Sequence, residues 1–248
     1  MLIIDKNQKR SSLPDHILEG LDLNMGMYSV KHYIALVTLL MLDVPICFNL
    51  LLTTFKYPVF LYPALVILGA IHIWAIRLLI KKYKQTQIEC LLYFGFLGFI
   101  GSFINFFLMM VSHFSIGITS PLYFVFMIFF YFFSIYLFSM REHKKYSSLK
   151  FRKVRFPYWQ DYVSMFTPGV VFALFVLLSG PYPLFPLGIL SLFFCWTFAY
   201  FFTFFMAKSF YRYVFIKRNI YHVRFEDKEL NRKYRVQRQM ELEEKTVK

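Results

Sequence analysis

The stretch CLLYFGFLGFIGSFINFFLMMVS, residues 90–112, decides the fold, because it has no charged side chain over 23 consecutive positions. A transmembrane helix needs roughly 20 mostly apolar residues. Outward from this stretch, the chain contains five more apolar segments, at residues 33–55, 58–80, 119–140, 162–179 and 184–207. We therefore predict an all-α fold, a polytopic transmembrane bundle of about six helical spans.

The overall composition supports the same class of protein. The chain is 58% hydrophobic, 22% aromatic and only 17% charged, whereas a soluble domain carries about a quarter charged residues. Its 33 phenylalanines exceed what a single soluble core of 248 residues would bury. In lipid such a composition is ordinary.

Lysine and arginine are concentrated in a few segments of the chain. Twenty-six of the 28 basic residues lie in residues 1–32, 81–89, 141–161 and 208–248. The remaining connections are short and nearly uncharged, at residues 56–57, 113–118 and 180–183. Cytoplasmic loops of membrane proteins are enriched in Lys and Arg. We therefore predict three hairpins, with both termini and the two basic loops in the cytoplasm, and read the net charge of +14 mainly as a topology signal.

These patterns divide the chain into three parts. They are a cytoplasmic N-terminal segment (1–32), a six-helix transmembrane domain (33–207) and a basic, helix-permissive cytoplasmic tail (208–248). The basic loops within the middle part are residues 81–89 and 141–161. The first 30 residues lack the apolar core of a cleavable signal peptide. The lack of a transit peptide and the charge asymmetry favour a bacterial inner (plasma) membrane, and an organellar membrane is the alternative.

Asp43 is the sharpest candidate for chemistry inside the membrane. It lies near the middle of the first apolar segment, where a carboxylate costs about 2.5–3.5 kcal/mol on insertion scales. An ion or proton site could combine Asp43 with Asn49, His72 and Asn105, since a contact between Asp43 and His72 is geometrically possible across one hairpin. The alternative is a hydrogen-bonded Asp that only fixes helix packing.

Small residues mark a helix-packing face in the third segment. Gly98 and Ser102 are four residues apart, and Gly95 and Gly101 widen the face. Small residues at this spacing let two membrane helices approach closely. The partner helix could lie within the bundle or in another copy of the chain.

Basic and aromatic residues alternate just before the fifth segment. The run contains Arg152, Lys153, Arg155, Tyr158 and Trp159. Bases of nucleic acids can stack on such aromatic side chains. Trp, Tyr and basic residues are also the usual anchors at a membrane surface, where Lys and Arg meet anionic lipid headgroups. We favour the interfacial anchor and expect no direct sequence-specific binding of nucleic acid.

The tail carries alternating blocks of charge without Gly or Pro from Arg224 onward. Its basic residues include Arg224, Arg232, Lys233, Arg235 and Arg238. A solvated helix that continues the sixth segment is the simpler interpretation. Docking on a cytoplasmic partner or another subunit is the functional one.

Recognisable catalytic and metal-binding motifs are missing from the sequence. There is no HExxH, no GxSxG and no GxxxxGK[ST], and the histidines do not cluster. The three cysteines, Cys47, Cys90 and Cys195, are widely separated in apolar surroundings, as expected for inert buried thiols. We therefore expect no enzyme activity, no metal site and no cofactor.

Two functional hypotheses follow from the sequence. The first is a non-catalytic, multi-pass membrane subunit of a larger envelope assembly of the secretion or DNA-transfer type. It would contact other subunits, or copies of itself, through the basic loop and tail. The alternative is a small transporter or channel that uses Asp43 and its polar neighbours.

Overall fold

The computed structural model describes residues 1–23, 27–47, 58–115, 117–149, 165–174 and 192–246. Nearly all of this part of the chain is helical, and its only pairing of extended backbone is an isolated parallel bridge between Asp22 and Arg224. The elements are η1 (Arg10–Ser12), α1 (Asp15–Leu21), α2 (Met27–Ala35), η2 (Leu36–Asp43), α4 (Pro58–Ile80), α5 (Tyr83–Ser115), α6 (Pro121–Lys145), a short apolar helix at Met165–Leu174, η4 (Leu192–Trp196), α9 (Thr197–Arg218), η5 (Ile220–His222) and α10 (Lys228–Thr246).

Four helices are long and apolar enough to cross a membrane. They comprise Val30–Cys47, Tyr83–Phe114, Pro121–Lys145 and Leu192–Arg218. Two shorter apolar helical stretches accompany them, Leu65–Ile80 within α4 and Met165–Leu174. The prediction of an all-helical protein with membrane-spanning segments is therefore confirmed at this level.

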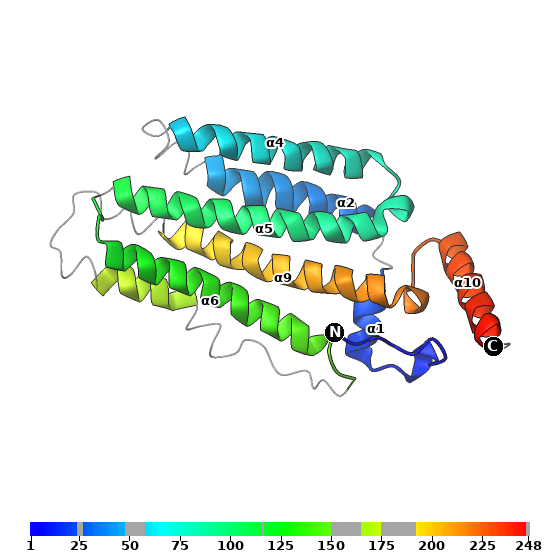
Figure 1. Cartoon of the computed structure of the whole chain (residues 1–248). Coiled ribbons are helices and arrows are strands. Elements are labelled where there is room, and N and C mark those ends of the chain that lie inside the picture. Colours follow the sequence, from blue (N-terminus) through cyan, green and yellow to red (C-terminus); the bar gives the residue numbers. More distant parts are fainter. Residues whose placement is uncertain (24–26, 48–57, 116, 150–164, 175–191, 247–248) are drawn as a thin grey trace.

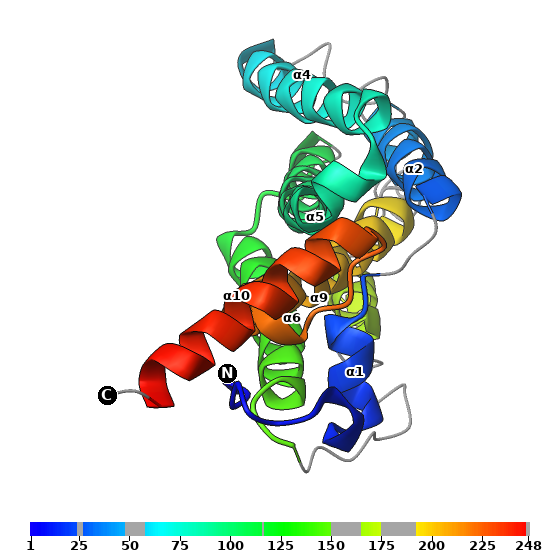
Figure 2. The same ribbon diagram turned by 90° about the vertical axis from the view of Figure 1, so that its right-hand side faces the viewer.

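The long helices lie nearly parallel and form an elongated bundle (Figure 1). α5 and α9 occupy its middle, α2 and α4 lie along one side, and α6 lies on the other. α10 crosses one end of the bundle, beyond the last turn of α9, and the end-on view shows it in front of the long helices (Figure 2). The N-terminus and the last described residues of the tail lie at this same end.

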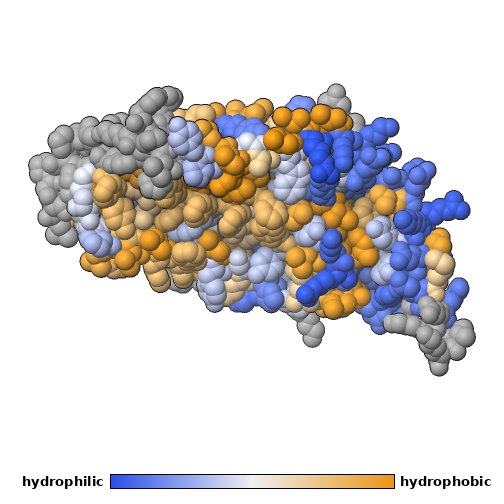
Figure 3. Space-filling model, turned by 45° about the horizontal axis from the view of Figure 1, so that its top comes forward, coloured by the Kyte–Doolittle hydropathy of each residue, from blue (hydrophilic) through white to orange (hydrophobic). Residues whose placement is uncertain are grey.

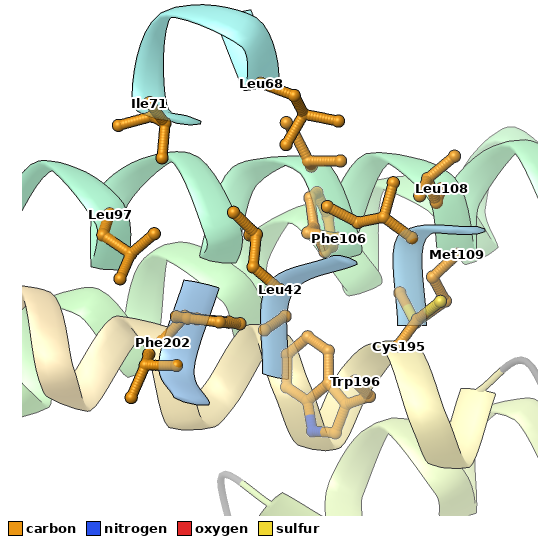
Figure 4. Close-up of a cluster of buried hydrophobic side chains, with 14 of the residues drawn as sticks. Leu42, Leu68, Ile71, Leu97, Phe106, Leu108, Met109, Cys195, Trp196 and Phe202 are labelled. Carbon is orange, nitrogen blue, oxygen red and sulfur yellow. The ribbon is translucent and has the colours of Figure 1, made fainter. Parts of the chain in front are cut away.

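The main hydrophobic core runs along the bundle, with α5 and α9 in the most extensive contact. Leu97 and Phe106 of α5 face Phe202 of α9 and Trp196 of η4 in this core (Figure 4). The indole of Trp196 also donates a hydrogen bond of 3.0 Å to the carbonyl oxygen of Met165. This bond connects the short 165–174 helix to the start of the last long helix.

The first span contains a π-helical stretch, η2, between two α-helical parts. Pro45 follows this stretch, and proline cannot donate the backbone hydrogen bond to the residue four positions earlier. Its ring also clashes with that carbonyl group unless the preceding turns adjust. The wider turns of η2 directly before Pro45 fit this requirement, and they end at Asp43.

Several helix boundaries differ from the sequence-based expectation. α2 begins at Met27, within the segment 1–32, and α6 continues to Lys145, within the expected basic loop 141–161. Residues 83–89, expected in a basic loop, form the first two turns of α5, because Tyr83 and Gln87 are buried there. Residues 208–218 of the tail continue the last span within α9, as expected, but this helix ends at Arg218 and α10 begins after a turn. That turn allows α10 to fold back across the end of the bundle.

Apolar side chains cover most of the bundle surface in the view of Figure 3, and hydrophilic ones gather toward the end with α10. Large apolar side chains that point outward are found on several long helices, among them Leu40, Val66, Ile73, Phe103, Phe129 and Phe132. A monomeric soluble protein rarely exposes so continuous an apolar surface. Lipid contact accounts for it.

Candidate functional site

Asp43 and His72 form a hydrogen-bonded pair on the α2–α4 side of the bundle. Asp43 is the last residue of η2, and His72 lies in the second half of α4. His72 Nε2 lies 2.8 Å from Asp43 Oδ2, and His72 Nδ1 lies 2.7 Å from the carbonyl oxygen of Leu68. The structure thus places in contact two of the four residues considered for an ion or proton site.

The hydrogen bonds of His72 determine the charge of the pair. A carbonyl oxygen only accepts, so Nδ1 carries a hydrogen and donates it to Leu68. Nε2 then either accepts a hydrogen from a protonated Asp43 or, in an imidazolium, donates one to the carboxylate. The net charge of the pair is zero in both arrangements. A neutral pair is far less costly in an apolar segment than a lone carboxylate.

The pair lies near the surface of the bundle and not at its centre. The side chains of Asp43 and His72 are 24% and 31% exposed, and exposed Val44 and Ile73 follow them in sequence. α4 occupies the outer edge of the bundle (Figure 2). In a membrane, the pair therefore faces lipid or another polypeptide.

The other two candidates for this site do not join the pair in the described part of the chain. Asn105 is fully buried in α5, where its Nδ2 donates to the carbonyl oxygen of Gly101 at 2.8 Å and its Oδ1 has no hydrogen-bond partner. Asn49 falls outside the described residues.

The glycine face of α5 packs inside the chain, against α9. A Cβ atom at Gly98 would meet the backbone nitrogen of Met206 at 2.6 Å, and one at Gly101 would meet the ring of Phe202 at 2.8 Å. A Cβ at Gly95 would meet the ring of Phe210 at 2.7 Å. The face is filled by α9 and is not available to another copy.

Ser102 also serves as a polar contact between helices. Its hydroxyl lies 2.5 Å from the hydroxyl of Thr203 on α9 and donates to the hydroxyl of Tyr131 on α6 at 3.1 Å. All three residues are buried. This network joins the three helices in the interior of the bundle.

A second hydrophobic core lies at the end of the bundle, which we call the terminal cap. We define the cap as residues 1–23, the last turns of α9 and residues 219–246. Its core contains buried side chains from both ends of the chain, including Ile4, Leu13, Ile17, Leu21, Phe215, Val223 and Phe225. The sequence interpretation treated the two ends as separate segments. The repeat of apolar residues at 13, 17 and 21 is a helix-face signal that could have indicated burial.

Arg212 and Asn219 of the cap bind the N-terminal segment through its backbone. The Arg212 guanidinium donates to the carbonyl oxygens of Glu19, Gly20 and Asp22, at 3.2, 3.1 and 2.6 Å. These carbonyls lie at the C-terminal end of α1, where a cation is favourable. The charged side chain is therefore used for structure although it is buried.

Asn219 uses both ends of its amide on the first residues of the chain. Its Oδ1 accepts a hydrogen bond from the backbone nitrogen of Ile4 at 2.7 Å, and its Nδ2 donates to the carbonyl oxygen of Leu2 at 3.1 Å. Nearby, the backbone nitrogen of Leu2 donates to the carbonyl oxygen of Tyr146 at the end of α6. The N-terminal residues are thus held by both α6 and the turn after α9.

α10 is attached to the N-terminal segment as well. Arg238 donates to the carbonyl oxygens of Lys6 and Gln8, and Glu241 accepts from Lys6 and Tyr221. The Lys6 contact lowers the pKa of the Glu241 carboxyl below its usual value. The tail is therefore a docked helix and not a free extension.

The predicted basic tail residues divide into two groups. Arg224, Arg232, Arg235 and Arg238 line a cleft of about 860 Å³ between α10, η5 and the N-terminal segment, where Arg10 joins them. Lys233 lies outside this cleft, on an exposed stripe of α10 with Met240. The contribution of Arg10 was not foreseen from the sequence, because it depends on the docking of the N-terminal segment.

The remaining candidates can be placed briefly. The interfacial anchor residues Arg152, Lys153, Arg155, Tyr158 and Trp159 fall outside the described residues. Cys90 and Cys195 are buried as expected, whereas Cys47 is exposed, so the prediction of a buried thiol is wrong at this position. Within the described ranges, no group of three His, Cys, Asp or Glu side chains could hold a metal ion.

Together, the apolar helices and the outward-facing apolar side chains define an integral membrane protein of helical type. Comparison with known protein families, with curated proteins and with solved structures found no significant match.

Proposed function

We propose that the chain is a non-catalytic, multi-pass membrane subunit that crosses the membrane about six times and docks a cytoplasmic partner on its terminal cap. One observation carries this proposal: residues from both ends of the chain pack together into one folded, basic structure at a single end of the bundle. A tail that served only as a topology signal would not need a hydrophobic core of its own. The concentration of Lys and Arg in this end supports a cytoplasmic position, and we propose the bacterial inner membrane as its location.

The outer stripe of α10 is the proposed docking surface. Leu230 and Tyr234 of this helix pack into the cap, whereas Lys233 and Met240 face outward, and exposed Val236 borders both this stripe and the neighbouring cleft. Val236 and Met240 are 45% and 57% exposed, although both are apolar. An exposed apolar stripe bordered by charge is typical of a surface that another helix or domain covers. The glycine face of α5 gives no support for contact between subunits, since α9 fills it.

The test is copurification from native membranes in mild detergent. The double substitution Lys233→Glu with Met240→Asp should release the partner while the chain itself stays folded. Lys9→Glu with Ile3→Asp is the matched control, because both residues are exposed in the cap and neither lines the surface around Lys233 and Met240. A wild-type chain that purifies as a partner-free monomer under these conditions would overturn the proposal.

A small transporter or channel is the second candidate, and the Asp43–His72 pair favours it. A proton shared between a carboxyl and an imidazole is a plausible element of a proton-coupled pathway. Asp43→Asn keeps a hydrogen-bonding group of the same size but cannot exchange the proton. If the chain transports, this substitution abolishes a pH-dependent flux in proteoliposomes without affecting assembly. An unchanged flux in the variant would dismiss the pathway.

A further inference from the structure

The cleft under α10 is strongly positive. Six of its twelve lining residues are Arg or Lys and none is acidic: the basic ones are Arg10, Arg224, Lys228, Arg232, Arg235 and Arg238. They come from the N-terminal segment, from the strand-like turn after η5 and from α10. Charges of one sign gathered in a concave surface raise the local concentration of counter-ions. The cap therefore contains a ready site for an anion.

The six basic groups are not used equally by the protein itself. Arg10 and Arg238 each bind backbone carbonyl oxygens, and Arg10 also lies 3.8 Å from the Asp22 carboxylate. The other four, Arg224, Lys228, Arg232 and Arg235, are exposed and form no ion pair with a described residue. Two arginines are thus held in fixed positions, and four cations around them lack a counter-charge.

His222 supplies an independent sign of a ligand. It lines the same cleft and is only 3% exposed. Its Nε2 lies 3.0 Å from the carbonyl oxygen of Asp5, so this nitrogen carries the hydrogen and donates. Nδ1 is buried without any hydrogen-bond partner in the described structure. Such an unsatisfied buried atom is costly, and a ligand oxygen that shares a proton with Nδ1 would remove the cost.

The size and chemistry of the cleft suggest the kind of anion. Its volume of about 860 Å³ falls within the range of sites for small molecules. Guanidinium groups bind phosphate oxygens in a two-pronged geometry, and a phosphate monoester carries about −1.5 to −2 charges at neutral pH. Four uncompensated cations therefore match two or more phosphate groups.

We propose that this cleft binds a soluble small molecule carrying two or more linked phosphate groups. The residues that line the cleft belong to the N-terminal segment, to η5 and the turn after it, and to α10, and none of them lies in the long apolar helices. This position suits a ligand from solution better than a lipid headgroup, which must remain at the membrane surface. Arg232 and Val236 border both the cleft and the outer stripe of α10, whereas Arg224, Lys228 and Arg235 line the cleft alone.

The experiment measures binding of tripolyphosphate to the full chain in an uncharged detergent by titration calorimetry. One molecule should bind per chain. Each of the substitutions Arg232→Ala and Arg235→Ala should raise the Kd at least about tenfold, so the double variant should bind about a hundredfold more weakly. Lys233→Ala removes one charge from the same helix outside the cleft, and we expect a change of less than about twofold. Equal weakening by Lys233→Ala, or unchanged binding by the double variant, would overturn the proposal.

A second arm separates soluble ligands from lipids. The chain is titrated with vesicles of neutral lipid with and without an anionic phospholipid. Binding to anionic vesicles that depends on Arg232 and Arg235, with no binding of tripolyphosphate, would show a lipid site and overturn the soluble ligand. A variant that loses tripolyphosphate binding but still copurifies with the partner separates this proposal from partner docking. A variant that loses the partner but still binds tripolyphosphate separates them equally.

Discussion

At the scale of single residues, His72 and His222 use their rings in the same way but differ in their surroundings. Each donates one ring N–H to a backbone carbonyl oxygen, from Leu68 and Asp5 respectively. The second nitrogen of His72 meets the Asp43 carboxyl group, whereas the second nitrogen of His222 meets no hydrogen-bond partner. The first histidine belongs to a complete pair. The second belongs to an incomplete site.

The pKa of His222 predicts how the cap responds to acid. Burial lowers this pKa below the usual 6.5, and the charges of Arg238 and Arg10 lower it further, while the Asp5 carbonyl acts in the opposite direction. In the unfolded cap His222 binds a proton near pH 6.5, and in the folded cap it does so only at lower pH. Stability contributed by neutral His222 is therefore present above pH 6.5 and is lost as the pH falls below it.

We expect the amides of α10 to be less protected from hydrogen exchange at pH 5.5 than at pH 7.5, where protection is the exchange rate relative to an unfolded chain at the same pH. The His222→Gln variant should show a smaller difference in protection between the two pH values. Gln retains a donor for the Asp5 carbonyl oxygen but does not titrate. The pKa of Glu241 lies below its usual 4.5, so the stability that its carboxylate contributes is lost only at lower pH. The range from pH 7.5 to pH 5.5 therefore reports on the histidine. Saturating tripolyphosphate should reduce the acid effect in the wild type. Identical exchange in wild type and variant would contradict the assignment.

At the scale of helices, the contact between α5 and α9 depends on the missing side chain at Gly98. A Cβ at this position would lie 2.6 Å from the Met206 nitrogen and 2.9 Å from the carbonyl oxygen of Phe202. Both are backbone atoms of α9, so the two helices would have to separate. Gly69 on α4 offers a matched comparison, since nothing lies within 4 Å of a Cβ there.

We predict that Gly98→Ala destabilises the bundle by about 1–3 kcal/mol, a typical cost of overpacking. Gly69→Ala should be neutral or slightly stabilising, because alanine favours helix more than glycine by about 1 kcal/mol. Thermal unfolding of the purified protein in detergent measures both. A similar melting temperature for the two variants would show that α5 and α9 do not pack as closely as described.

The sequence was sufficient to predict the long apolar helices, but not their ends or the short helix α1. The uncharged run 90–112 indicated α5, yet the helix begins seven residues earlier, at Tyr83. Its first turns are polar and basic, like a loop, yet Tyr83 and Gln87 are buried by contacts with distant parts of the chain. The Tyr83 hydroxyl donates to the carbonyl oxygen of Leu23 at 3.1 Å. Such a contact joins residues 60 positions apart, and no local pattern encodes it.

At the scale of the whole molecule, the described residues form two hydrophobic cores, and the surfaces that cover these cores differ in polarity. The long core of the bundle lies within the apolar surface, and the smaller core of the terminal cap lies under a charged one (Figure 3). The charge pattern predicted that the two ends of the chain share a compartment. It did not predict that they bind each other, because the cleft residues Arg10 and Arg232 become neighbours only after both ends fold.

This arrangement predicts that the first residues of the chain hold α10 in place. Ile4 is 5% exposed within the cap core, whereas its neighbour Ile3 is 71% exposed. An Ile4→Asp substitution buries a carboxylate among apolar side chains, which costs about 2 kcal/mol or more. A destabilisation of about 2 kcal/mol increases the population of the open cap roughly 30-fold. Trypsin cleavage within α10, which is rich in Lys and Arg, should accelerate accordingly, since cleavage follows the open population when closing is fast. Ile3→Asp introduces the same charge one residue away and should leave the rate within about twofold of wild type. Equal cleavage of the two variants would mean that the N-terminal segment does not restrain the tail.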